Sequence, residues 1–339
     1  ASNNTAVGTS ALTANTTGTE NVATGYNALA ANTTGNYNTA LGQGALDSNT
    51  TASSNTAVGW NSLQTNSTGG NNTAMGFNAL AANTTGAYNV AVGYQALAAN
   101  TTGRNVALGA DSLAANTTGS SNCGLGDSTL SLNTTGTGNT AAGFNALDSN
   151  TTASNNTAVG LSALGANTTG TQNVAVGTYA LDANTTANNN VAVGYASLGV
   201  NTTGASNVAM GTSALQANTT ASNNTAIGMS ALEANTTGAS NTAVGLSAGS
   251  SVTTGAHNTL IGALTGAHNY NLQTGNYNVL VGSLSDTGAS DTDNANAFGY
   301  NTFATEGYTT VGNYTDDIRA AHGVATWATV SDERYKKDI

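Results

Sequence analysis

The sequence predicts an all-β fold, a parallel β-solenoid, and three observations carry this prediction. A seventeen-residue unit, Asn-Thr-Ala-Val-Gly-x-x-Ala-Leu-x-Ala-Asn-Thr-Thr-Gly-x-x, repeats about fourteen times over roughly the first 250 residues. The 339 residues include 42 Gly and no Pro, which suits stacked strands because every backbone N–H is needed by a neighbouring coil. An apolar residue recurs at fixed positions of the unit, which argues against disorder.

The glycines define the register of the repeat and the organisation of the chain. They are spaced by seventeen from Gly8 to Gly93, one sixteen-residue step leads to Gly109, and the spacing of seventeen then holds to Gly245. The repeat decays afterwards. We therefore divide the chain into a solenoid shaft (1–249), a region of degenerate repeats that forms a transition or cap (250–330), and a separate C-terminal segment (331–339).

Each coil is expected to begin with a short strand, such as residues 39–41. Alternation would place Thr39 and Leu41 on one face and Ala40 on the other. The apolar residue before the glycine is expected to form a core row, and the leucine four residues after the glycine a second core row. The members of the first row are Val7, Leu41, Val58, Met75, Val92, Leu108, Leu125, Val159, Val176, Val193, Met210, Ile227 and Val244.

The Asn-Thr-Thr-Gly block reads as the turn, since Gly accepts a positive φ and Asn and Thr side chains bond to nearby backbone. Gly is replaced there by Ala52, Ala153, Ala187 or Ala221, so the position does not demand a left-handed conformation. The asparagine before each strand, such as Asn38, is expected to form an inward ladder of amides. Two short strands and two turns per coil follow.

A core of one Val, one Leu and a few Ala per coil is thin, so we expect the chain to associate. Small residues such as Ala40, Ala57 and Ala74 would leave a flat second face for another chain. A homotrimer, intertwined or side by side, is the preferred arrangement. A monomeric solenoid remains open as an alternative, because seventeen residues are close to the eighteen of a triangular left-handed helix of hexapeptides.

The formal net charge is −11, and Arg104 is the single cation of the repeats. Nucleic acid is an unfavourable partner for such a surface. The acids are scattered singly, so neither a calcium site nor a pair of catalytic carboxylates is predicted, and we expect no metal and no cofactor. His257 and His268 are expected to lie in repeat loops, with metal binding by symmetry-related copies as the alternative. Cys123 is expected to be a buried core thiol. No run of about twenty apolar residues indicates a membrane-spanning segment.

Six aromatic residues follow repeat glycines and could form an exposed stripe for contact with a glycan or another surface. They could equally cover the edge of the core. They are Tyr26, Trp60, Phe77, Tyr94, Phe144 and Tyr195. A threonine ladder that binds ice is a less favoured reading of the recurring Thr-Thr pair, because adjacent threonines of a strand face opposite ways.

The Asn-x-Ala-Val-Gly-x-x-Ala-Leu repeat resembles the head repeats of trimeric autotransporter adhesins, and more closely the repeats of phage tail-fibre proteins. This resemblance covers residues 1 to about 250. It implies a left-handed parallel β-roll with three chains side by side in a stiff, exposed fibre.

The last nine residues, 331–339, resemble the opening of the endosialidase-type intramolecular chaperone domain, whose signature is Ser-Asp-x-Arg-x-Lys followed by Asp or Asn and Ile. Here the fixed positions are filled from Ser331 to Ile339. The resemblance implies that a downstream domain trimerises the fibre and then cuts itself off. Ser331 would be the nucleophile and Lys336 the general base. This single-turnover cleavage is the only enzymatic step expected, and it belongs to the longer parent chain.

The function expected from the sequence is that of a structural fibre, the shaft or distal tail fibre of a phage or phage-like particle that presents its end to a host surface. Its partners would be two further copies of itself, other tail proteins of the virion, and a glycan or protein of the host surface, without membrane insertion. Its location would be the virion tail fibre, outside the cell. A trimeric adhesin or filament of a bacterial cell surface is the alternative.

Overall fold

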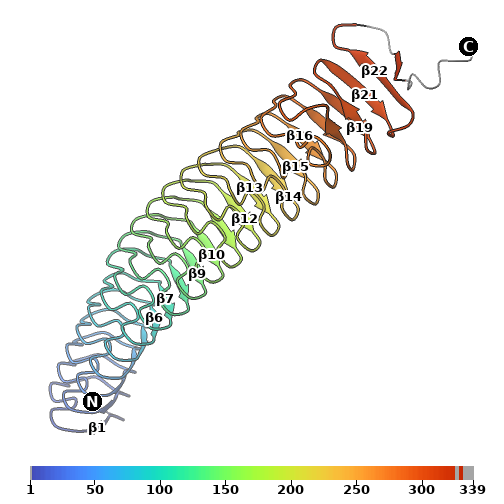
Figure 1. The fold of residues 1–339 in the computed structure, drawn as a ribbon. Helices are drawn as coiled ribbons and strands as arrows, with labels where there is room; N and C mark the ends of the chain where they lie inside the picture. Colours follow the sequence, from blue (N-terminus) through green and yellow to red (C-terminus); the bar gives the residue numbers. More distant parts are fainter. Residues whose placement is uncertain (1, 325–327, 331–339) are drawn as a thin grey trace, which may run out of the picture. The chain divides into compact units, whose positions relative to one another are not determined.

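The computed structural model describes residues 2–324 and 328–330. They form two compact units, Ala1–Gln172 and Asn173–Ile339, and each is considered by itself. The described residues form strands, turns and bends but no helix. Within each unit the chain winds in flat coils that stack on one another, with one strand of every coil beside the strand of the next (Figure 1).

The first unit is a stack of ten coils. Their strands pair in parallel at a shift of seventeen residues, for example Ala23 with Ala40, and of sixteen between β6 and β7. The strands are β1 (Thr5–Val7), β2 (Val22–Thr24), β3 (Thr39–Leu41), β4 (Thr56–Val58), β5 (Thr73–Met75), β6 (Val90–Val92), β7 (Val106–Leu108), β8 (Cys123–Leu125), β9 (Thr140–Ala142) and β10 (Thr157–Val159).

The second unit has eight coils of the same kind, and its last strands then run antiparallel to their neighbours. The coil strands are β11 (Val174–Val176), β12 (Val191–Val193), β13 (Val208–Met210), β14 (Thr225–Ile227), β15 (Thr242–Val244), β16 (Thr259–Ile261), β17 (Val279–Val281) and β19 (Asn296–Gly299). β21 (Tyr308–Gly312) pairs in parallel with β19, whereas β22 (Asp317–Ala321) and β23 (Ala328–Val330) follow in antiparallel. β18 (Asp286–Thr287) and β20 (Phe303–Ala304) form a separate short pair.

These features confirm the all-β parallel solenoid with seventeen-residue coils. Two details of the prediction were wrong. The two units hold ten and eight coils, more than about fourteen, because β16, β17 and β19 keep the fold where the sequence repeat has decayed. The coils from β1 to β16 also have one strand and not two, since the segment at the repeat-leucine position is a turn there. Among the described residues, a second strand occurs only in the coils of β17 and β19, as β18 and β20. The handedness and the trimer stay predictions.

The strand faces the opposite way from the prediction. The central alanines, such as Ala40 and Ala74, are fully buried. The residues before the glycine point outward, with Leu41 38% and Met75 43% exposed. Alternation along a strand tells that neighbours lie on opposite faces but not which face is inside. The predicted core row from Val7 to Val244 is therefore an outer row, and the predicted flat alanine face is the core.

The narrow interior explains why alanine is the inner residue. A Cβ at Gly124, which replaces alanine in β8, would overlap the Ser112 hydroxyl and lie 2.7 Å from Thr129 Oγ1. Ser112 and Thr129 stand where most coils have alanine before the repeat leucine, and their hydroxyls bond to each other at 2.7 Å. The larger Thr129 is thus accommodated by the smaller Gly124 of its own coil.

The leucine row is core, as predicted. The side chains from Leu29 to Leu232 in this row are 0% exposed. Their backbone lies in the left-handed region, with φ of 53° at Leu29, which costs about 1–2 kcal/mol for a residue with a Cβ. Burial of the side chain and a bond from Leu29 N–H to the Ala45 carbonyl at 2.9 Å hold this conformation.

Two asparagine ladders run through the coils beside the leucine row, one more than predicted. In the first, Asn38 N–H donates to Asn21 Oδ1 at 2.9 Å, and Asn38 Nδ2 donates to the Ala52 carbonyl at 2.9 Å. In the second, Asn49 Nδ2 donates to Asn32 Oδ1 at 2.9 Å and to the same Ala52 carbonyl at 3.1 Å. The shared acceptor is a backbone carbonyl, which both Gly and Ala supply at this turn position.

The degenerate coils keep the core volume by exchanging positions. Gly249 and Gly266 stand where leucine is usual, and Leu260 and Leu280 stand where the strand usually has alanine. Leu260 and Leu280 are fully buried. A Cβ at Gly266 would lie 3.4 Å from Leu260 Cδ2 and 3.5 Å from Leu280 Cδ1, so the leucines fill the space that the glycines leave. The fold persists because this exchange conserves volume.

Candidate functional site

The six aromatic residues singled out in the sequence are all exposed. In the first unit, Trp60, Phe77 and Tyr94 follow the glycines of three successive coils and are 42%, 40% and 51% exposed. Their rings stack in a ladder, with centroid separations of 4.7 Å and 5.3 Å. Both faces of Phe77 are therefore covered by neighbouring rings, and the ladder presents ring edges to solvent.

The other three aromatic residues of this set do not extend that ladder. Tyr26 is 54%, Phe144 52% and Tyr195 55% exposed. In the second unit Tyr195 meets Tyr179 edge-on, with centroids 6.2 Å apart. Contact of the six rings with a glycan or surface stays a prediction.

The sixteen-residue coil between Gly93 and Gly109 locally interrupts the regular stacking. One residue is missing from its turn, where Gly103-Arg104-Asn105 replaces the Gly86-Ala87-Tyr88-Asn89 of the coil before. The strands on either side stay in register, with Val92 opposite Leu108. The missing residue is thus absorbed entirely within the turn.

The shortened turn changes the second asparagine ladder. Asn100 Nδ2 donates to the Thr102 carbonyl at 2.7 Å and not to Asn83 of the preceding coil. Within the described residues, Asn83 Oδ1 is left buried without a hydrogen-bond partner. Loss of a partner at a buried acceptor costs about 1–3 kcal/mol. Asn235 Oδ1 is unpaired for a different reason, because buried Val252 takes the ladder position in the next coil and has no donor.

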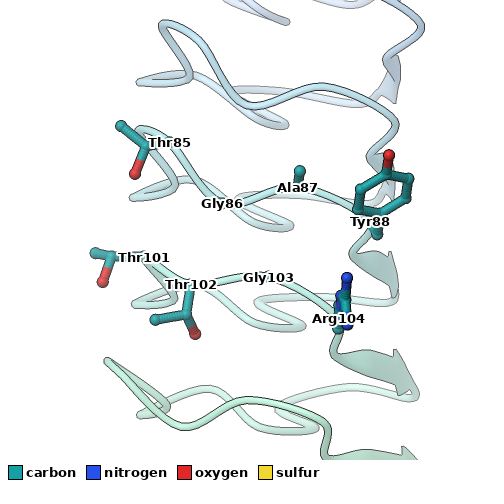
Figure 2. Close-up of a pocket in the computed structure, with 8 residues that line it drawn as sticks. All are labelled: Thr85, Gly86, Ala87, Tyr88, Thr101, Thr102, Gly103 and Arg104. Carbon is teal, nitrogen blue, oxygen red and sulfur yellow. The ribbon is translucent and has the colours of Figure 1, made fainter.

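A notch of about 480 Å³ lies between the turn at residues 85–88 and the shortened turn at residues 101–104. We define the notch by the residues that line it, which are Thr85, Gly86, Ala87, Tyr88, Thr101, Thr102, Gly103 and Arg104. Tyr88 and Arg104 lie on successive coils at one end of it, and Thr85 and Thr101 lie at the other end (Figure 2).

The notch contains a free cation and an exposed ring. Arg104 is exposed and, among the described residues, its guanidinium forms no ion pair or hydrogen bond. Tyr88 is 60% exposed. Both residues have a positive φ, 67° at Arg104 and 62° at Tyr88, because they occupy the same left-handed position just before the ladder asparagine. The sequence shows the sixteen-residue spacing and the isolated arginine, but only the folded turns place Arg104 beside Tyr88.

The remaining candidate residues do not gather in a site. Cys123 is half-buried in the outer face of β8, between Val106 and Thr140, so the prediction of a core thiol was wrong for the same reason as the inverted strand. Burial raises the pKa of this thiol. Ser331 and Lys336 lie outside the described residues, and their role in self-cleavage stays a prediction.

The two histidines are separate in the described structure. His257 stacks on Tyr277 at 4.9 Å, and the backbone N–H of His268 bonds to Asp286 Oδ2 at 3.3 Å. The described residues contain no cluster of three metal-ligating side chains. No helix long and apolar enough to cross a membrane occurs in the described ranges.

The coils and ladders define the class of protein, which is a parallel β-solenoid repeat protein. Comparison adds no more specific assignment, because no family model, no curated protein and no solved structure matches this chain.

Proposed function

We propose that this chain is a structural fibre protein, a shaft or distal tail fibre of a phage or phage-like particle that contacts a host surface. The observation that carries the proposal is the outer row of the coils. In the first unit this row presents Met75, Leu108 and Leu125 at 39–43% exposure, and in the second it presents Met210 and Ile227 at 42% and 39%. Large apolar residues occupy this position in most coils of each unit, with Thr24 and Ala142 as exceptions in the first unit. Such a row is typical of a surface that another chain covers.

The occupant we propose for this row is two further copies of the same chain. The resemblance of the repeats to trimeric fibres favours threefold association, and the same residue at each level would meet its own equivalent across the symmetry axis. The largely apolar core and the asparagine ladders suit a mechanical role, since they link each coil to the next.

The first experiment is light scattering coupled to size-exclusion chromatography of the purified chain. The proposal expects about three times the 33.2 kDa of the chain. A single-chain mass at micromolar concentration would overturn the trimer and leave a self-sufficient solenoid.

A charged substitution in the outer row tests which surface associates. Met75→Asp should shift the mass from trimer towards monomer while circular dichroism keeps its β signal, because the side chain is solvent-accessible in the single chain. Thr68→Asp, at an exposed turn position of the preceding coil, is the matched control and should leave the mass unchanged. An unaffected Met75→Asp trimer would place the interface elsewhere.

A surface adhesin of a bacterial cell remains the competing assignment, because it would use the same trimeric coils. The sequence that precedes these repeats in the gene distinguishes the two. A virion-attachment domain supports the tail fibre, whereas an export or anchoring segment supports the adhesin.

A further inference from the structure

The notch at the short coil has hydrogen-bonding groups that most regular turns of the first unit pair. In the turns that begin at Thr33, Ser67 and Thr117, two successive backbone N–H groups donate to one carbonyl of the next coil, at 2.8–3.3 Å. Thr84 and Thr85 hold the same positions above the short coil. Within the described residues neither N–H makes that bond, and the carbonyl of Thr101, the acceptor by position, receives none.

The side-chain hydroxyl of Thr84 also lacks its usual hydrogen bond. The first threonine of a turn ordinarily donates its hydroxyl to the next coil, as Thr33 Oγ1 does to the Thr50 carbonyl at 3.0 Å. Thr84 makes no such bond in the described structure, although Thr101 of the next coil resumes the pattern with a bond of 2.9 Å to the Thr117 carbonyl. The missing residue therefore leaves donors and an acceptor open beside the notch.

From these groups we infer that the notch is a binding site for a carboxylate-bearing sugar, a pyranose of the hexuronate type. Arg104 offers a planar, unpaired guanidinium that binds a carboxylate with two hydrogen bonds. The backbone N–H of Thr85 and the Thr101 carbonyl suit sugar hydroxyls, which both accept and donate. The exposed Tyr88 ring offers an apolar surface to the sugar ring.

Size and charge fit this class of ligand. The notch is open to solvent, and its volume of about 480 Å³ leaves room for one sugar ring. Arg104 is the only cation before Arg319, in a chain with a net charge of −11, so an anionic group would be directed to this one place in the coils. The choice of a saccharide rests on the proposed contact with a host surface. The notch itself is built within one chain and does not depend on trimerisation.

The test is a titration of the whole chain by calorimetry and ligand-observed NMR with four probes: methyl glucuronide, methyl glucoside, acetate and inorganic phosphate. We expect binding of the glucuronide and at least tenfold weaker binding of the other three. Equal binding of acetate or phosphate would reduce the notch to a general anion site and overturn the saccharide assignment. No binding of the glucuronide at tens of millimolar would overturn the site.

Two variants separate the cation from the shape of the notch. Arg104→Gln should weaken glucuronide binding by tenfold or more. The double variant R104Q/S121R moves the arginine to the equivalent exposed position of the next coil, which has a regular turn. This double variant should not recover glucuronide binding. If it did, an arginine on a regular turn would be sufficient for binding and the notch would not be required.

Restoring the missing residue keeps Arg104 and removes the notch. Insertion of one alanine between Gly103 and Arg104 recreates the Gly-Ala-x-Asn pattern of Gly86 to Asn89. Thr84 and Thr85 should then pair with Thr101, so glucuronide binding should fall at least tenfold while the melting temperature rises. Unchanged binding by this insertion variant would overturn the role of the notch.

A failure of the binding-site proposal can be distinguished from a failure of the fibre proposal. A monomer that binds glucuronide through Arg104 would contradict the fibre and keep the site. A trimer that ignores every probe would keep the fibre and overturn the site.

Discussion

Asparagine is the residue that links one coil to the next inside this fold. Asn66, for example, is fully buried and donates both amide hydrogens, to Asn49 Oδ1 at 3.0 Å and to the Gly69 carbonyl at 2.9 Å. Its own Oδ1 accepts from Asn83. Three buried bonds per side chain make the amide irreplaceable by groups of similar size.

Substitution of Asn66 tests this role. We expect Asn66→Ala to lower the free energy of unfolding by roughly 2–3 kcal/mol, since it leaves the buried acceptor Asn49 Oδ1 unpaired and removes the acceptor Oδ1 to which Asn83 Nδ2 donates. Thr68→Ala, two residues further in the same turn and exposed, should cost less than about 0.5 kcal/mol. Denaturant unfolding followed by circular dichroism measures both, and similar values for the two variants would contradict the ladder's contribution.

Two acidic residues give stability a dependence on pH. Burial raises the pKa of Asp182, and likewise of Asp47, above the ordinary value of 3.8. A raised pKa in the folded state means that the charged form is disfavoured there, so these groups destabilise the fold above that pKa and the penalty disappears as the pH falls through it.

The expected result for Asp182→Asn follows from that sign. The variant should melt at a higher temperature than the parent at pH 7, and the difference should shrink towards zero near pH 3. Thermal unfolding at the two pH values measures this, with exposed Asp127 changed to Asn as the control. A gain that is as large at pH 3 as at pH 7 would exclude the ionised carboxylate as its cause.

At the scale of the element, the short strand fixes which side chains are inside. The sequence predicted the strand that precedes each repeat glycine, the leucine row and the first asparagine ladder, because these depend on the period alone. It could not predict that Ala74 is buried and Met75 exposed. That choice depends on the width of the coil, which is set by the turn leucines and amides packed against the strand.

Paired substitutions in β5 test the orientation. Ala74→Leu should destabilise the fold by about 1–3 kcal/mol, because the inner position has no room for a larger side chain. Met75→Leu should have an effect below about 0.5 kcal/mol in the single chain. The free energies of unfolding of the two variants are compared at the same chain concentration. A larger effect at Met75 than at Ala74 would mean that alanine faces outward, as the sequence predicted.

The exchange of leucine and glycine in the degenerate coils can be reversed experimentally. Leu260→Ala should cost about 2–5 kcal/mol through the cavity it leaves. The double variant L260A/G249L should recover much of this loss. Gly249 already has a φ of 60°, close to the values that the core leucines adopt. Thermal unfolding of the single and double variants measures the recovery, whose absence would show that the two positions do not share one space.

At the scale of the whole molecule, the sequence predicted a coiled architecture but not the notch. The isolated Arg104 and the sixteen-residue step are both visible in the printed chain. Their juxtaposition with Tyr88 and the unpaired Thr84 and Thr85 depends on how one turn closes over another, which no linear spacing reports. The coil count was also underestimated, because the period lengthens after residue 250 while Leu260 and Leu280 keep the core filled.

The short coil also bears on how such a chain changes over generations. Val92 and Leu108 remain opposite each other across the short coil. An inherited deletion of one residue in a turn therefore changes the surface locally and leaves the pairing of the strands intact. Gain or loss of a whole repeat by unequal recombination would likewise leave every remaining coil with the neighbours it requires. The number of coils and the surface of a single turn can therefore evolve independently, the first by copying coils and the second by editing single turns.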